Sequence, residues 1–171
     1  AMTMLKEIAE QAPPRLGDGQ ALPATYRLRS AEQRSALAGQ LGNNDRAEAA
    51  VEAALAWLAA QQEEDGSWDA DRWGSGVETR VHGHNRQGAG TKADTGITGL
   101  AVLAFLASGH THLDGTYRTN VQHGLEYLLR SQAADGNLAG QARFFARMYC
   151  HGMASLALSE ALAMTGDVRI K

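Results

Sequence analysis

The sequence predicts an all-α protein built from helical hairpins that stack into two curved, concentric layers. Three observations lead to this prediction. Apolar residues recur at helical spacing, a hairpin-sized pattern occurs twice, and two nearly uncharged helices alternate with two amphipathic ones. Because a helix that is apolar all round must be covered on most sides, the uncharged helices belong to the inner layer and the amphipathic ones to the outer layer.

Residues 1–29 are expected to form an extended N-terminal arm. All three prolines of the chain lie in this arm, and proline both fixes the backbone and removes a hydrogen-bond donor. A short helix is predicted at 31–41, because Ser30 is a suitable N-cap and Gly42 a suitable stop. Residues 30–171 are expected to form a single helical domain, and the whole chain to contain five or six helices.

Two segments have the pattern of amphipathic outer helices. In residues 45–62 the apolar positions follow the i, i+3, i+4, i+7 spacing of one helix face, which predicts that this face is buried. The positions are Val51, Ala54, Leu55 and Leu58. Residues 117–132 repeat the pattern, with charged side chains turned outward.

Two other segments have the pattern of inner helices. Residues 95–108 carry no charge and are predicted to be buried on most sides, whereas residues 151–164 are mostly apolar with one glutamate, Glu160. Each inner helix follows an amphipathic one, so the hairpin repeats are 45–108 and 117–166. An offset of 70 residues aligns the outer helices and an offset of 56 aligns the inner ones, which means that the connecting loop is longer in the first hairpin.

Each outer helix leads into a corner with the same residue pattern. The first corner has an aromatic residue, a glutamine, an Asp-Gly pair and a tryptophan, at Trp57, Gln62, Asp65, Gly66 and Trp68. The second has Tyr127, Gln132, Asp135 and Gly136, with Leu138 in place of the tryptophan. A glutamine can satisfy free carbonyls at a helix end, Asp-Gly forms a tight reversal and tryptophan can cover the corner. These residues are therefore expected to have a structural role.

The corner pattern resembles the QW motif of terpenoid cyclases. Over about residues 45–166 the chain is similar to bacterial proteins with prenyltransferase and squalene oxidase repeats, which belong with the squalene cyclases and the protein prenyltransferase β subunits. The resemblance implies a partial α/α toroid, because a closed ring in that superfamily needs five or more hairpins. It also implies that the chain is a fragment of such a ring.

The composition of the chain limits the classes of partner that it is expected to bind. Lys plus Arg number 16 and Asp plus Glu 19, so no basic field favours nucleic acid as a partner. No run approaches the roughly 20 apolar residues of a membrane span, and the first residues lack the pattern of a secretion signal. The chain is expected to be soluble, with its compartment left open.

No catalytic residue, metal or cofactor is predicted. The cyclases that this chain resembles use an aspartate-rich DxDD motif as their acid, and this motif is absent here. The most similar segment is Asp69-Ala70-Asp71-Arg72. The prenyltransferases hold zinc through Asp, Cys and His, but neighbouring residues on a helix, such as Cys150 and His151, point about 100° apart. Two His-x-His pairs, at 82/84 and 110/112, flank one inner helix and are expected about 20 Å apart.

The loop at 73–92 is the best candidate for a ligand site, because long loops in compact domains are often functional. It leads into Asp94 and Thr95, which are expected to cap the inner helix. The aromatic residues Phe144, Phe145 and Tyr149 favour a staple or core role over a ligand-facing one. The candidate ligand-binding residues are His82, His84, Arg86, Asp94, Thr95, Tyr149 and His151.

Three hypotheses of function follow. The first is a repeat domain of unassigned activity that binds an apolar, isoprenoid-like molecule or a peptide on its inner helices. The second is a portion of a true terpenoid cyclase or prenyltransferase whose acid or metal site lies outside this chain. The third is an interaction module that forms a homodimer through exposed inner helices.

Overall fold

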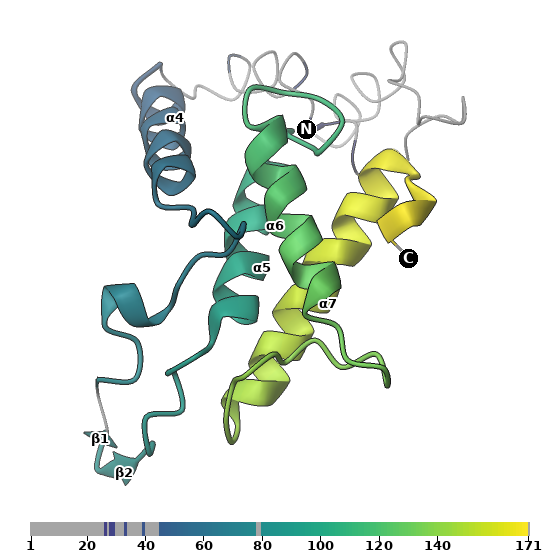
Figure 1. The fold of residues 1–171 in the computed structure, drawn as a ribbon. Coiled ribbons are helices and arrows are strands. Elements are labelled where there is room, and N and C mark those ends of the chain that lie inside the picture. Colours follow the sequence, from purple (N-terminus) through teal and green to yellow (C-terminus); the bar gives the residue numbers. More distant parts are fainter. Residues whose placement is uncertain are drawn as a thin grey trace, which may run out of the picture.

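The computed structural model describes residues 45–77 and 80–170, together with Tyr26, Leu28, Arg29, Gln33 and Gly39. The described residues hold four α-helices, two short 3-10 helices and a two-stranded hairpin, which confirms the all-α class (Figure 1). In chain order these are α4 (Asp45–Ala60), η1 (Asp71–Trp73), β1 (Arg80–Val81), β2 (His84–Asn85), α5 (Asp94–Ala107), α6 (Arg118–Arg130), α7 (Ala146–Thr165) and η2 (Val168–Ile170). The predicted arm at 1–29 and the predicted helix at 31–41 fall almost entirely outside the described residues.

The two inner helices, α5 and α7, pack closely against each other because glycines line their contact. A Cβ atom on Gly96 would lie 2.9 Å from Sγ of Cys150, and one on Gly99 would lie 2.8 Å from the backbone of Met153. The helix backbones can therefore approach more closely than larger side chains would allow. α7 begins at Ala146, five residues before its predicted start, and ends at Thr165, one residue after its predicted end. The left-handed backbone of Gly166 closes the helix.

The core lies between these inner helices and α6. Val102, Phe105 and Leu106 of α5 are fully buried, as are Val121 and Leu128 of α6. The same cluster includes Ala154 and Ala157 of α7. One face of α6 and most of α5 thus form a single apolar interior, as expected for an outer helix on an inner one.

The first corner joins three elements. The buried Trp68 donates its indole N–H to the Leu58 carbonyl, 2.8 Å away, and its amide donates to the Thr98 hydroxyl of α5 at 3.0 Å. Gln62 donates to the carbonyls of both Gly66 and Asn120, each at 3.0 Å. The Gln62 side chain therefore ties the corner to the start of α6. The prediction that it would bond to the free carbonyls of its own helix end was wrong.

The second corner has the same backbone as the first. In the first, the amide of Glu63 donates to the Ser67 carbonyl at 2.9 Å; seventy residues later Ala133 and Asn137 make the same bond at 2.9 Å. Asp65 accepts from the Ser67 amide at 2.9 Å, and Asp135 accepts from that of Asn137 at 3.0 Å. Leu138 is buried where the first corner has its tryptophan. The repeat seen in the sequence is a repeat of structure.

Two predictions about buried faces were wrong in part. On α4, Leu55 is buried but Val51 is 42% exposed and Ala54 is also exposed. On α5, Ile97 is 37% and Leu100 is 49% exposed, although the helix carries no charge. Both helices are covered on one side only by the described residues, so an apolar stripe is left open on each.

The long loop between α4 and α5 contains a hairpin that the sequence pattern does not predict. β1 and β2 pair antiparallel, with Arg80 opposite Asn85. At the other end of the molecule, two residues that precede α4 contact α7: Arg29 pairs with Glu160, and Tyr26 donates to the same carboxylate at 3.4 Å. Among the described helices, none combines the length and apolar character that crossing a membrane requires.

Candidate functional site

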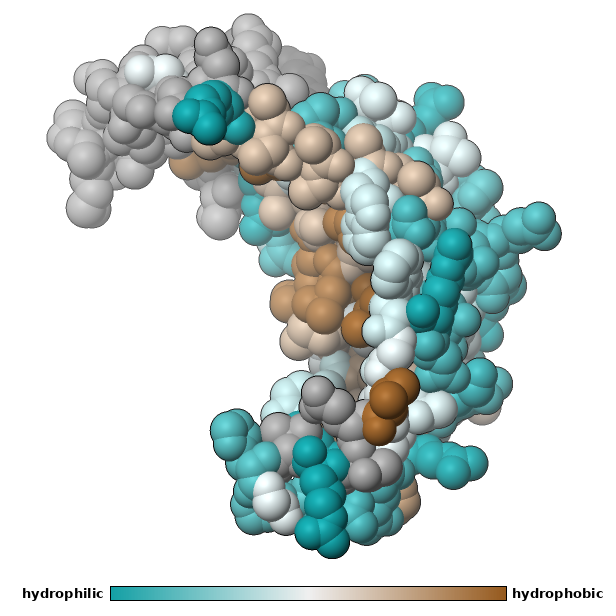
Figure 2. Space-filling view, turned by 90° about the vertical axis from the view of Figure 1, so that its left-hand side faces the viewer, coloured by the Kyte–Doolittle hydropathy of each residue, from teal (hydrophilic) through white to brown (hydrophobic). Residues whose placement is uncertain are grey.

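A pocket of about 460 Å³ opens where the N-terminal ends of α5 and α7 meet the long loop. Its walls are mostly apolar, and Arg86 is the one charged residue among the described residues that line it. The large apolar side chains in the lining are Ile97, Leu100, Phe145, Tyr149 and Met153. Figure 2 shows apolar surface gathered in the middle of one face of the molecule, the side on which α4 and the hairpin lie in Figure 1.

Glycines allow the loop to form one wall of this pocket. A Cβ atom on Gly76 would lie 2.1 Å from Oγ1 of Thr91, and one on Gly90 would lie 2.6 Å from Oγ of Ser75. The Ser75 hydroxyl also donates to the Gly90 carbonyl at 2.8 Å. The two ends of the loop therefore lie against each other at a distance that only glycine permits.

Two aspartates that follow the first corner, Asp69 and Asp71, anchor this loop. Asp69 accepts hydrogen bonds from the amides of Asp71 and Arg72, at 2.8 and 3.3 Å. Asp71 accepts from the amide of Lys92 at 3.1 Å and pairs with its ammonium group, and these bonds lower the pKa of the Asp71 carboxyl. Asp71 thus ties the beginning of the loop to its end, and Asp69 stabilises the turn at its beginning.

The lining side chains leave much of their apolar surface in the pocket and around it. Phe145 is 48% and Tyr149 69% exposed, so the predicted staple or core role of the aromatic residues was wrong. The guanidinium group of Arg86 lies 5.8 Å from the centre of the Phe145 ring, within range of a cation–π contact. The site offers a hydrocarbon surface with one cation at its edge.

The structure divides the predicted ligand-binding residues. Arg86 and Tyr149 line the pocket, whereas His82 and His84 are exposed in the hairpin and are absent from the lining. His151 is turned to another neighbour: its Nδ1 accepts from the amide of Leu138 at 3.1 Å, which places the ring proton on Nε2 when the ring is neutral.

The predicted capping of α5 was wrong. The residue at the cap position is Ala93, and no side chain bonds there. Asp94 lies inside the first turn and accepts the amide of Ala70 at 3.0 Å, while Thr95 is buried against Gly140. Burial raises the pKa of the Asp94 carboxyl, and the nearby Asp69 and Asp71 add to that effect. Asp94 therefore joins the inner helix to the corner.

Cys150 and His151 have separate surroundings, as their positions on one helix predict. The Cys150 side chain is buried between the inner helices, and its sulfur lies 3.7 Å from the Ala93 carbonyl. Burial raises the pKa of this thiol, so it is protonated at neutral pH. Within the described part of the chain, no group of three or more His, Cys, Asp and Glu residues is placed to hold a metal ion.

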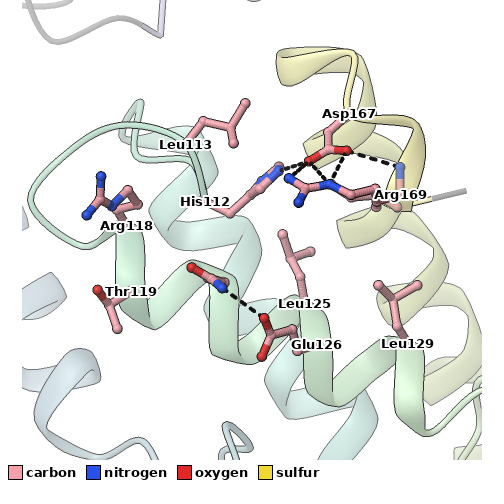
Figure 3. A pocket seen from close by; sticks show the side chains of 11 residues that line it. His112, Leu113, Arg118, Thr119, Leu125, Glu126, Leu129, Asp167 and Arg169 are labelled. Carbon is pink, nitrogen blue, oxygen red and sulfur yellow. Dashed lines mark hydrogen bonds and ion pairs between the residues drawn. The ribbon is translucent and has the colours of Figure 1, made fainter. Parts of the chain in front are cut away.

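A second pocket, also of about 460 Å³, lies between α6 and the C-terminal turn (Figure 3). His112 and Asp167 meet at its edge, with Nε2 3.0 Å from Oδ2, and Arg169 binds the same carboxylate. His112 thus lies at the far end of α5 from the hairpin histidines, as the length of that helix predicts. Leu125 and Leu129 of α6 form the floor of this pocket.

Sequence reasoning missed the aliphatic lining of the first pocket. Ile97 and Leu100 are spaced i, i+3 and Phe145, Tyr149 and Met153 are spaced i, i+4, so each set lies on one face of its helix. That spacing was a usable signal. The spacing could not show that these two helix faces lie side by side and are left uncovered.

Comparison with known proteins gives one match. Residues 34–149, more than half of the chain, match the squalene-hopene cyclase C-terminal domain. Searches of curated proteins and of solved structures found no match.

Proposed function

This chain belongs to the squalene-hopene cyclase C-terminal domain family, whose fold is the α/α toroid, and from that premise we propose that it binds an apolar, isoprenoid-like molecule at the inner-helix pocket. Membership of the family confirms the predicted fold class, a partial α/α toroid. The observation that carries the proposal is the pocket itself, in which Ile97, Leu100 and Tyr149 keep a large exposed apolar surface.

The lining suits a chain-like hydrocarbon with one polar end. The pocket volume of about 460 Å³ is within the range of roughly 300–1,000 Å³ that small-molecule sites occupy. Branched and thioether side chains, such as Leu100 and Met153, pack well against irregular hydrocarbon, and Arg86 can donate hydrogen bonds to an oxygen at the end of the molecule. Water leaving these side chains supplies the free energy of binding, at about 25 cal/mol per Å² of apolar area.

The test is displacement of a fluorescent apolar dye by farnesol, a short isoprenoid alcohol. Leu100→Asp should weaken farnesol binding about tenfold or more, because a carboxylate would have to lose water against the hydrocarbon. Leu113→Asp is the matched control. Leu113 is 45% exposed against 49% for Leu100, and it lines the other pocket, so its variant should bind farnesol as the parent does.

Two results would contradict the proposal. One is failure of farnesol to displace the dye from the parent chain. The other is an equal loss of binding in both variants, which would show that the dye and farnesol bind elsewhere. If apolar peptides displace the dye and farnesol does not, the peptide hypothesis would replace the isoprenoid one.

Family membership also favours a second candidate, in which the chain is a portion of a terpenoid cyclase or prenyltransferase. In that case the acid or metal site lies outside this chain, since the sequence carries no DxDD acid. Both candidates predict that this chain alone forms no cyclic triterpene from squalene, so the sequence of the parent gene is what separates them. A DxDD run or a zinc triad in the parent protein outside these 171 residues would decide for the second candidate.

A further inference from the structure

We propose that copies of this chain associate head to tail, with α4 of one copy docked on the second corner and α6 of the next. The docking of α6 on the first corner inside the chain provides the template. The repeat offset of 70 residues then identifies both surfaces of the new contact. This inference uses the outer helices and does not depend on the proposed ligand.

Inside the chain, α6 docks on the first corner through backbone and small residues. Gln62 donates to the Asn120 carbonyl at 3.0 Å, and a Cβ atom on Gly66 would lie 2.3 Å from the His123 carbonyl oxygen. Gly124 lies against Trp68, because a Cβ atom placed on it would be 3.3 Å from the indole ring. The first corner is therefore filled by the beginning of the next outer helix.

The second corner is built in the same way and has no outer helix on it among the described residues. Gln132, which corresponds to Gln62, has an exposed side chain. Gly136 corresponds to Gly66, and nothing lies within 4 Å of the place where its Cβ would be. The second pocket lies along α6, the helix that leads into this corner, and Leu125, Glu126 and Leu129 are among its lining residues (Figure 3).

α4 carries the matching surface. Asn120, Val121 and Gly124 of α6 correspond to Ala50, Val51 and Ala54 of α4, and these three are exposed. The three α4 residues are small and apolar. The corresponding positions in α6 lie against the first corner and the core. An incoming helix can offer Gln132 a backbone carbonyl, as Asn120 offers one to Gln62, and this bond does not require asparagine at position 50. The bond that the Asn120 side chain donates to Oε1 of Gln62, at 2.8 Å, has no counterpart at Ala50.

Residue sizes at the two corners also match. In the internal contact Gly124 lies against Val102 and Trp68, because a Cβ atom placed on it would be 2.7 Å from Cγ2 of Val102 and 3.3 Å from the indole ring. At the second corner Leu138 replaces the tryptophan, and the incoming helix carries Ala54 in place of glycine. A smaller residue on the corner is paired with a larger one on the helix, as complementary packing requires.

The contact joins two different surfaces, so it is heterologous, and successive copies can form a ring or an open array. The experiment measures mass in solution, by light scattering over a range of concentrations, for the whole chain. We expect masses above that of one chain that rise with concentration. Ala54→Arg should block the α4 surface and Gln132→Trp the corner, and each variant alone should have the mass of a single chain.

Mixing the two blocked variants gives the decisive result. Each retains the surface that the other has lost, so an equal mixture should form a pair and nothing larger. Ala56→Arg is the control on α4, because position 56 is exposed and about 200° around the helix from position 54; this variant should associate as the parent does. Far-ultraviolet circular dichroism of every variant checks that the helices are intact.

Three outcomes would overturn the proposal. The parent chain could have the mass of one chain at all concentrations, as it would if another part of the chain covered α4. The blocked variants could associate as the parent does, which would point to the inner helices instead. Finally, the mixture of blocked variants could contain no pairs.

Discussion

Trp68 does more for the fold than its partner in the motif, Trp57. Trp68 is 3% exposed and bonds to Leu58 and Thr98, whereas Trp57 is 51% exposed and contacts Trp73 with the two rings tilted by 56°. We expect Trp68→Ala to lower the free energy of unfolding by about 3–5 kcal/mol, and Trp57→Ala by less than about 1.5 kcal/mol. Urea unfolding of both variants measures the difference. Equal losses would mean that the corner is not part of the cooperative core.

Asp167 should make the protein sensitive to acid. Arg169 and His112 bind its carboxylate and hold its pKa well below the ordinary value, although burial works in the opposite direction. A lowered pKa in the folded state stabilises the fold at pH values above the ordinary pKa, and the contribution is lost as pH falls through the lowered one. Asp167→Asn should therefore cost about 1 kcal/mol or less at pH 7, because Arg169 is exposed.

The measurement is urea unfolding of Asp167→Asn and the parent at pH 7 and pH 3. The gap between them should narrow at the lower pH. Asp114→Asn is the control, since Asp114 is an exposed carboxylate in a nearby loop. A gap that is the same at both pH values would show that the carboxylate charge has no part in stability.

Single residues were predictable from the sequence where their partners are local. The Asp-Gly turns form as expected, because Asp65 and Asp135 bond to amides two residues away. The role of Asp94 was not predictable in this way: its partner is Ala70, which a local capping rule does not consider. The exposure of Tyr149 was not predictable for a similar reason, because the sequence does not say what covers the start of a helix.

The contact between α5 and α7 depends on one side of α5 being free of side chains. Gly99→Ala should destabilise the fold by about 1–3 kcal/mol, because its Cβ would lie 2.8 Å from the Met153 backbone and the helices would have to separate. Gly152 of α7 has nothing within 4 Å, so Gly152→Ala should stabilise by up to about 1 kcal/mol. Thermal unfolding of the two variants compares them. A gain in stability from both would show that the inner helices have room to spare.

Helices were the most predictable elements, and their exposed faces the least. The periodicity located α4, α5 and α6 to within two residues of their observed ends, because period reflects which face is apolar. It cannot state whether a neighbour is present to cover that face. Val51 of α4 and Leu100 of α5 are exposed because no described residue lies over them. The hairpin at Arg80–Val81 and His84–Asn85 was missed, since two-residue strands carry almost no pattern.

Across the whole molecule, stability should be uneven. α5 contributes three fully buried apolar side chains to the core, whereas α4 contributes Leu55 as its buried one. Amide hydrogen exchange in α5 and α7 should therefore be at least about tenfold slower than in α4. The measurement is made by mass spectrometry on dilute protein, where single chains predominate. Exchange in α4 as slow as that in α5 would show that α4 belongs to the same cooperative unit.

The loop between α4 and α5 is longer than the corresponding loop of the second hairpin. The second hairpin reaches the same corner and inner helix with a shorter connection, so the helical scaffold does not require the extra length. That length supplies one side of the pocket, through Gly76, Arg86 and Gly90. Replacing or shortening this excursion should therefore reshape the pocket while the helices stay as they are.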